Sequence, residues 1–243
     1  MKKACNISLS VIFVIAVVIL TITCSIGLPI YVRPFYYSHV ESIQEEFKYE
    51  LGIDIEREVI VDAYDEVLDF LTKNNREFGA GKLHYSEEGK GHFEDCKILF
   101  DLNRNALIIS LVAVAVLLIL NKLKVVELAR PFGFSLTAIA GVGTLVSFAV
   151  LGLIVAQDFS AAFTVFHKIF FPGKSNWMFN PYTDPIILFM PQRFFMHCAI
   201  LICVSILVVS IVHIVFGIVR RKKAEYFHMQ SNRERLIFYR CRR

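Results

Sequence analysis

Charged residues are scarce in this sequence: of its 243 residues, 20% are Asp, Glu, Lys or Arg, whereas 56% are hydrophobic. Soluble globular domains carry about a quarter charged residues. The composition therefore excludes an ordinary water-soluble protein and indicates a membrane protein. The chain is also too short for a large soluble catalytic domain beside its membrane part, so any active site must lie at or near the bilayer.

Several familiar enzyme motifs are missing as well. The sequence contains no Walker A run, no nucleophile elbow and no His-Glu-x-x-His. Gly141-Val142-Gly143 follows no predicted strand and lies in an apolar run, which favours close helix packing over dinucleotide binding. Six cysteines give no disulfide framework, because five of them fall in or beside apolar runs. They are Cys5, Cys24, Cys96, Cys198, Cys203 and Cys241.

Long apolar runs are what the sequence has in abundance. Four of them, at about residues 7–30, 106–126, 132–156 and 194–219, are long enough to cross a hydrocarbon core. Apart from histidines, these runs hold almost no ionisable residue, which argues against a small-molecule transporter. We expect an all-α integral membrane protein of four transmembrane helices.

The distribution of charge predicts the orientation of the chain. The segments assigned to the cytoplasm hold 14 basic and 3 acidic residues, and the outer segments hold 12 basic and 19 acidic residues. By the positive-inside rule both termini are cytoplasmic and the large polar region is extracellular. The basic C-terminal tail is expected to bind anionic lipid head groups rather than nucleic acid.

These assignments divide the chain into seven segments. Residues 1–37 form the N-terminus and first transmembrane helix, 38–104 an extracellular cap, and 105–130 the second transmembrane helix with a cytoplasmic turn. Residues 131–157 form the third transmembrane helix, 158–195 an aromatic-rich outer loop, 196–219 the fourth transmembrane helix and 220–243 a basic cytoplasmic tail.

The cap is predicted to be mainly helical. Five apolar residues recur at i, i+4, i+7, i+8 and i+11, which places them on one face of an amphipathic helix. A second short helix is predicted over residues 41–51, ending at Gly52. The five residues of the apolar face are Ile60, Tyr64, Val67, Leu68 and Leu71.

The outer loop is rich in aromatic residues. Phe159, Phe163, Phe166 and Phe170 recur at helical spacing, which predicts an interfacial helix that begins near Ser160 and ends at Pro172-Gly173. An ordinary aromatic belt is the alternative. Polar residues are interleaved with the aromatic ones, however, and these are His167, Asn176 and Asp184.

The polar segment 84–97 contains a second histidine of interest. His84, Glu88 and His92 have the spacing of metal ligands, but Gly89 and Gly91 are expected to interrupt the helix that this site needs. We expect a helix to begin at His92 instead.

On that helix Asp95 would share a face with His92 and fix the tautomer of its ring. The alternative, which spacing alone favours, is a surface ion pair of Asp95 with Lys97 or Lys90. Because His92 and His167 both stand where the polar cap meets the aromatic interface, we expect them to face one cavity from opposite sides.

With these features the sequence resembles the lipoprotein intramolecular transacylases of Gram-positive bacteria. The resemblance covers the four-span layout and is most specific in two blocks, residues 86–97 and 166–195. The first block holds His92, Asp95 and Lys97, and the second holds His167, Phe171, Gly173, Trp177, Phe179, Asp184 and Pro191. Two departures are Cys96, where an aliphatic residue is expected, and Lys174-Ser175, which looks like extra length before Asn176-Trp177.

The resemblance implies a membrane acyltransferase. It would move the sn-2 acyl chain of a diacylglyceryl lipoprotein to the α-amino group of the lipoprotein's own N-terminal cysteine, giving a lyso-form lipoprotein. His92 and His167 would be the catalytic residues, with no metal, no cofactor and no covalent acyl-enzyme. Residues expected to orient or stabilise the reacting groups are Asp95, Lys97, Ser86, Trp177, Asn176 and Asp184. Residues expected to form an aromatic chamber for the substrate are Phe166, Phe170, Phe171, Phe179, Tyr36 and Tyr37.

The resemblance implies two partners, the lipoprotein substrate and membrane lipid, and no nucleic acid. The protein is expected to be a monomer in the bacterial cell membrane. One histidine would act as general base and acid, and the other would stabilise the oxyanion. Spacing does not assign these roles, although Asp95 favours His92 as the base. The alternative function is a non-catalytic membrane-anchored cap module that binds a partner protein or lipid.

Overall fold

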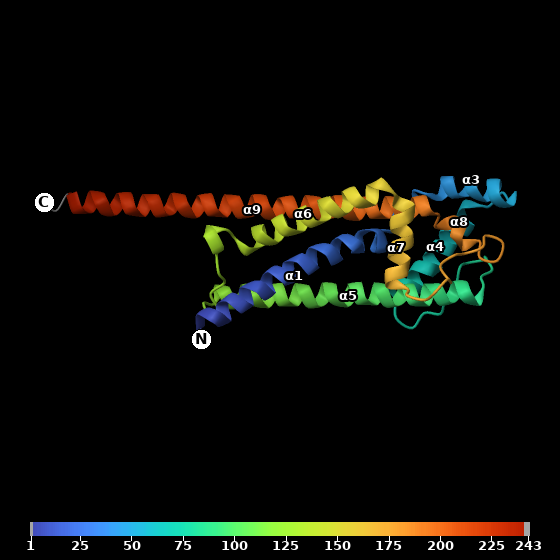
Figure 1. Ribbon diagram of the computed structural model, residues 1–243, viewed down its shortest axis with the longest axis horizontal. Coiled ribbons are helices and arrows are strands. Elements are labelled where there is room, and N and C mark those ends of the chain that lie inside the picture. The colour runs from blue at the N-terminus through green and yellow to red at the C-terminus, as the bar shows by residue number, and fades with distance from the viewer. Residues whose placement is uncertain (1, 241–243) are drawn as a thin grey trace. The chain divides into compact units, whose positions relative to one another are not determined.

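The computed structural model describes residues 2–240, where every regular element is a helix and no strand occurs (Figure 1). The all-α prediction is therefore confirmed for these residues. Cys241, at the end of the predicted basic tail, lies outside the described residues. The elements are α1 (Lys2–Tyr31), α2 (Arg33–Tyr37), α3 (Val40–Leu51), α4 (Arg57–Thr72), α5 (Glu87–Lys122), the 3-10 turn η1 (Pro131–Gly133), α6 (Leu136–Gln157), α7 (Phe159–Phe170), α8 (Ile186–Phe189) and α9 (Gln192–Arg240).

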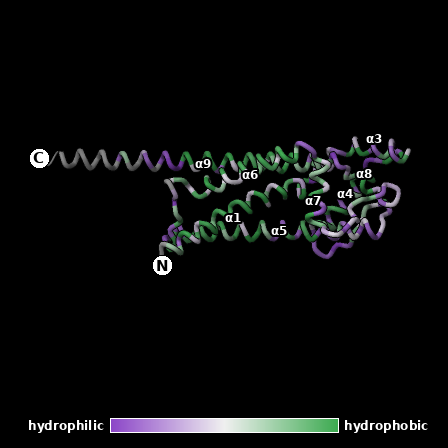
Figure 2. Tube along the Cα trace, in the orientation of Figure 1, coloured by the Kyte–Doolittle hydropathy of each residue, from purple (hydrophilic) through white to green (hydrophobic). Residues whose placement is uncertain are grey.

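Four of these helices are long and apolar enough to cross a membrane, as the sequence predicted. The candidate membrane spans are Ala4–Tyr31, Glu87–Lys122, Leu136–Gln157 and Gln192–Lys223. Figure 2 shows hydrophobic residues along α1 and α6, in contrast to the hydrophilic residues of α3.

The chain forms two compact units, each with its own core. The first consists of residues 1–22, 108–149 and 205–243. Phe13, Val17 and Leu117 are buried together in it. A side chain at Gly141 would lie 2.8 Å from the carbonyl oxygen of Ser210, so α6 and α9 pack closely there, as the small residues of α6 predicted. A side chain at Gly143 would meet nothing within 4 Å, so the prediction was wrong for this second glycine.

The second unit consists of residues 23–107 and 150–204 and contains the helices of the predicted cap. The five residues of the predicted apolar face on α4 are all buried, which confirms the amphipathic pattern. Helix α3 ends at Gly52 as predicted, because the left-handed backbone there (φ 68°) suits glycine. The short helix α8 packs on α3 and α4, and the hydroxyl of Tyr64 donates to the carbonyl oxygen of Phe189.

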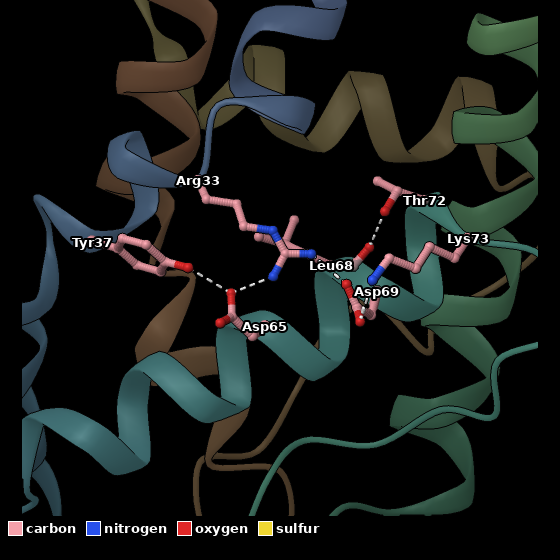
Figure 3. A network of polar contacts seen from close by, with 7 residues as sticks. All are labelled: Arg33, Tyr37, Asp65, Leu68, Asp69, Thr72 and Lys73. Carbon is pink, nitrogen blue, oxygen red and sulfur yellow. Dashed lines mark hydrogen bonds and ion pairs between the residues drawn. The ribbon is translucent and has the colours of Figure 1, made fainter.

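A network of charged residues fastens α2 to α4 within the second unit (Figure 3). The guanidinium of Arg33 pairs with the carboxylates of Asp65 and Asp69. Tyr37 donates its hydroxyl to Asp65 at 2.6 Å, and the ammonium of Lys73 lies 2.7 Å from Asp69. Tyr37 is thus engaged in this network instead of contributing to the aromatic chamber in which the sequence placed it.

The start of α5 differs from the prediction. The helix begins at Glu87, five residues before His92, and runs through Gly89 and Gly91 without interruption. Ser86 explains this start, since its Oγ accepts a hydrogen bond from the backbone N–H of Gly89 at 3.0 Å. A side chain at Gly89 would lie 2.3 Å from Oδ1 of Asp184, so a glycine is required for this approach of helix and loop.

Only part of α5 is suited to a hydrocarbon core. Its 36 residues extend about 54 Å at 1.5 Å per residue, far more than the roughly 30 Å of a bilayer core. All its charged residues before Lys122 lie within residues 87–104, and residues 105–121 contain none. His92 therefore belongs to the polar part of α5, outside the membrane-spanning segment.

Candidate active site

An apolar cavity of about 620 Å³ lies within the second unit. All of the α-helices of the second unit except α6 contribute to its wall, which comprises α1 to α5, α7, α9 and the segment between α7 and α9 with α8, and most of the lining side chains are aliphatic or aromatic. Figure 1 shows α7, the helix that carries His167, running crosswise to α5, the helix that carries His92. The residues of the wall that bear on its chemistry are His92, Cys96, His167, Phe171, Trp177 and Phe179.

The two histidines of the sequence prediction lie side by side in this cavity. The ring centroids of His92 and His167 are 5.9 Å apart, and the rings are inclined by 31°. The side chains are 6% and 7% exposed. Two imidazoles at this distance can both contact one small reacting group between them.

The environment of His167 determines its tautomer. Its Nδ1 lies 2.7 Å from the carbonyl oxygen of Phe163, one helical turn earlier, so Nδ1 carries the proton and donates it. Nε2 is then an unprotonated acceptor. The ring of Trp177 stacks on the imidazole with centroids 4.5 Å apart. Burial lowers the pKa of His167, and the bond to Phe163 opposes this effect only in part.

His92 is held more by packing than by hydrogen bonds. The rings of Phe171 and Phe179 meet it edge-on, with centroids 4.9 Å and 5.5 Å away. Its Nε2 lies 3.4 Å from Sγ of Cys96, and its buried Nδ1 has no hydrogen-bond partner among the described residues. Burial, reinforced by the neighbouring His167, lowers the pKa of His92 to about 4. Both rings are therefore neutral at neutral pH.

Asp95 does not bind His92, contrary to the prediction that it fixes the ring tautomer. Its carboxylate accepts hydrogen bonds from Nζ of Lys174, at 2.5 Å, and from Nδ2 of Asn176, at 3.3 Å. Burial alone would raise the pKa of Asp95, but the bonds from Lys174 and Asn176 outweigh it and lower the pKa. The alternative partners Lys97 and Lys90 were also wrong, because the loop after α7 brings Lys174 to this carboxylate.

Lys97 lies away from the histidines. Its ammonium donates to the backbone carbonyls of Phe70 and Lys73, at 2.8 Å and 2.9 Å, near the C-terminal end of α4. These carbonyls carry the partial negative charge of a helix terminus, which a cation stabilises. Lys97 thus joins α5 to α4 without reaching the cavity.

Ser86 and Asp184 join the start of α5 to the loop before α8. The backbone N–H and the hydroxyl of Ser86 both donate to the carboxylate of Asp184, at 2.7 Å and 2.9 Å. Thr183 donates to the same carboxylate at 2.8 Å. The buried carboxylate of Asp184 therefore accepts three hydrogen bonds, and the two from Ser86 fix the position of the first turn of α5, the helix that carries His92.

The predicted aromatic chamber is largely assembled around the histidines. Phe166, Phe171, Phe179 and Tyr36 line the cavity. Phe170 is not among the lining residues; its ring packs on Phe166 and is half exposed, because it falls on the outer side of α7.

Three contributors to the site were missed by sequence reasoning. Phe163 orients His167, and its spacing of four residues on the same helix was a usable signal. No sequence pattern indicated a role for Lys174, which looked like extra loop length. Cys96 enters the sequence analysis only as a departure from the family pattern, although its Sγ lies 3.4 Å from Nε2 of His92.

The metal-site alternative for residues 84–92 fails. His84 directs its Nε2 to the carbonyl oxygen of Tyr182, at 2.9 Å, instead of towards His92. Within the described part of the chain, no group of three or more His, Cys, Asp and Glu side chains is arranged to hold a metal ion.

Fold and site together define an integral membrane protein with a buried, neutral pair of imidazoles in an apolar cavity, a class suited to proton transfer on a lipid-like substrate. The family described as Lipoprotein intramolecular transacylase Lit matches residues 11–195, about three quarters of the sequence. The chain belongs to this family and is an enzyme of that kind.

Comparison with solved structures agrees with the fold. The membrane-integral lipoprotein intramolecular transacylase Lit from Bacillus cereus superposes with a TM-score of 0.81 at 22% identity, covering 93% of this chain and 100% of the other. Structures of two variants of the same enzyme, with one histidine replaced by arginine or by alanine, give TM-scores of 0.74 and 0.75 at 21% identity. Each covers 93% of this chain, and 96% and 97% of the other, respectively. No curated protein matched the sequence.

Proposed function

We propose that the enzyme transfers the sn-2 acyl chain of a diacylglyceryl lipoprotein to the α-amino group of the same molecule's N-terminal cysteine, with His92 and His167 as its catalytic residues. The C–N bond of an amide forms, the ester C–O bond breaks, and the amine proton ends on the glyceryl oxygen. The observation that carries the proposal is the pair of neutral, buried imidazoles 5.9 Å apart in an apolar cavity.

The chemistry explains why a neutral imidazole is useful here. An α-amino group has a pKa of about 7.7 to 8, so at neutral pH it is mostly protonated and cannot attack an ester. A neutral imidazole accepts the proton and returns it to the leaving oxygen, an effect worth roughly 10² to 10⁴ in rate. Because amine and ester belong to one substrate molecule, the aromatic wall serves to hold them close together.

The hydrogen bonds favour His167 as the base. The bond from its Nδ1 to Phe163 leaves Nε2 free to accept a proton. Burial raises the pKa of Cys96 to about 12, so its thiol stays protonated, and we assign this thiol as the donor in its 3.4 Å contact with Nε2 of His92. The proton of His92 is then on Nδ1, which is buried and has no partner among the described residues, and the proposed role of this N–H is to donate to the tetrahedral oxyanion once the substrate is bound. These roles are the reverse of those that the position of Asp95 in the sequence favoured.

The test uses purified enzyme in lipid and a synthetic diacylglyceryl lipopeptide with different acyl chains at sn-1 and sn-2. Mass spectrometry then reports which chain reaches the N-terminus. We expect only the sn-2 chain to move, and we expect His92→Ala and His167→Ala to lower the rate by at least about 10²-fold. His84→Ala is the matched control, because His84 binds the carbonyl of Tyr182 and does not line the cavity. Unchanged N-acylation by both variants, or transfer of the sn-1 chain, would contradict the proposal.

A further inference from the structure

A second cavity, of about 400 Å³, lies within the second unit beside the first, and it is polar. We call it the polar groove. It is formed by one face of the start of α5 and by the loop that follows α7. Its lining residues are Glu88, Gly91, Glu94, Asp95, Gly173, Lys174, Ser175 and Asn176.

The polar groove and the histidine cavity are lined by neighbouring residues of the same two segments. Gly91 lines the groove and His92, the next residue, lines the cavity; likewise Asn176 lines the groove and Trp177 lines the cavity. Nδ2 of Asn176 binds Asp95, and Trp177 stacks on His167. The two walls of the groove, the start of α5 and the loop after α7, are therefore the same segments that carry His92 and Trp177 into the cavity.

The substrate that the proposed function requires has two parts of opposite polarity. The acyl chains suit the apolar cavity, whereas each residue of the polypeptide carries a backbone N–H and C=O that are costly to bury without partners. The reacting amine is at the junction of the two parts. The polypeptide must therefore leave the histidines through a polar channel.

The polar groove offers such partners. Oδ1 of Asn176 is buried and has no hydrogen-bond partner among the described residues, so the capacity of this groove residue to accept a hydrogen bond is unused. Glu88 and Glu94 are exposed on the α5 side. With Asp95 they give three carboxylates against the single ammonium of Lys174, a formal net charge of −2.

We propose that the polar groove binds the first residues of the lipoprotein polypeptide after the lipidated cysteine, and that its charge favours basic over acidic sequences there. The proposal rests on the proposed function, because it takes the reacting amine to lie between the histidines. An extended chain advances about 3.3 to 3.6 Å per residue, so the second to fourth residues of the substrate are the ones within reach.

The experiment compares two diacylglyceryl lipopeptides, one with two lysines and one with two glutamates at the third and fourth positions. A diacylglyceryl-cysteine amide without further peptide serves as the minimal substrate. For each enzyme variant, kcat/KM on each lipopeptide is divided by that variant's value on the minimal substrate. A partly unfolded preparation lowers all three values equally and leaves the ratios unchanged.

We expect the natural enzyme to prefer the lysine peptide by about threefold to tenfold, and the preference to shrink at about 0.5 M salt. The variant with Glu88→Gln and Glu94→Gln should bring the ratio close to one, and Glu88→Lys with Glu94→Lys should invert it. The matched control is Glu41→Gln with Glu45→Gln. These two exposed residues of α3 lie outside both cavities, so the control should keep the natural preference.

Two results overturn the groove assignment alone, provided that the minimal substrate is N-acylated. The first is a ratio of one in the natural enzyme. The second is a preference for the lysine peptide that persists in the variant with Glu88→Lys and Glu94→Lys. Absence of N-acyl product from all three substrates overturns the proposed function and the groove assignment with it.

Discussion

At the scale of single residues, the site is a pair of imidazoles kept neutral by their surroundings. Burial lowers the pKa of both His92 and His167, and the neighbouring His167 adds to the cost of charging His92. A charged pair at this distance would be strongly unfavourable in an apolar cavity. Neutral rings are therefore the resting state, and one of them is ready to accept a proton.

This state predicts the pH dependence of the reaction. Below the pKa of the substrate amine, about 7.7 to 8, the rate should fall tenfold per pH unit because the free amine becomes rare. A histidine at its ordinary pKa of about 6.5 would add a second tenfold loss per unit below that value. Since the folded-state pKa of His92 is about 4 and burial lowers the pKa of His167 below its ordinary value, we expect the slope of one to continue below about pH 6.5, where a histidine at its ordinary pKa would already give a slope of two. Initial rates of N-acylation measure this slope, and a slope of two below about pH 6.5 would contradict the pKa values.

Trp177 gives a second prediction at this scale. Its ring stacks on His167, and its indole N–H donates to the carbonyl oxygen of Lys174. An aromatic pair contributes about 0.5 to 1.5 kcal/mol beyond its buried area. Trp177→Ala should therefore lower kcat by about threefold to tenfold or more, while Trp177→Phe should retain most of the activity. Equal loss in both variants would show that the ring does not act by stacking on the imidazole.

At the scale of elements, local sequence predicted some helices well and failed at others for identifiable reasons. The apolar periodicity of α4 and the stop at Gly52 after α3 depend on neighbours a few residues away, so both were readable. The start of α5 could not be predicted from neighbouring residues in this way. The glycine penalty of about 1 kcal/mol argued for a break, but the carboxylate of Asp184, 98 residues away from Ser86, outweighs it. The partner of Asp95 was missed for the same reason, because Lys174 lies 79 residues further along the chain.

The two glycines of α5 make a matched test of this explanation. A methyl group at Gly89 would lie 2.3 Å from Asp184 and 3.0 Å from Phe179, whereas at Gly91 its nearest contact, Nδ2 of Asn176, is at an ordinary 3.8 Å. We expect Gly89→Ala to reduce the free energy of unfolding by about 1 to 3 kcal/mol. Gly91→Ala should be neutral or stabilising by up to about 1 kcal/mol, since alanine favours a helix.

The thermal unfolding midpoint of each purified variant, in one detergent, measures this difference. A midpoint for Gly89→Ala equal to that of the natural protein would mean that α5 does not need the close approach of Asp184.

At the scale of the whole molecule, charge is segregated along the chain. The four apolar runs separate a net acidic group of residues, 38–104 and 158–195 taken together, from a basic group at the two ends and the turn at 122–130. The proposed function requires a lipoprotein substrate that is anchored in the outer leaflet with its polypeptide outside the cell. The residues of the polar groove belong to the acidic group, so an outward orientation of this group is needed for the substrate to enter.

This orientation can be tested directly in intact cells. With the native cysteines replaced, Glu45→Cys on α3 and Lys222→Cys on α9 place one thiol in the acidic group and one in the basic group. Both native side chains are exposed, so each new thiol should be accessible to reagent. Because the positive-inside rule puts the basic group in the cytoplasm, a membrane-impermeant maleimide should label Glu45→Cys at once and Lys222→Cys only after the cells are opened. Labelling of Lys222→Cys in intact cells, with Glu45→Cys protected, would reverse the orientation and separate the histidines from the substrate.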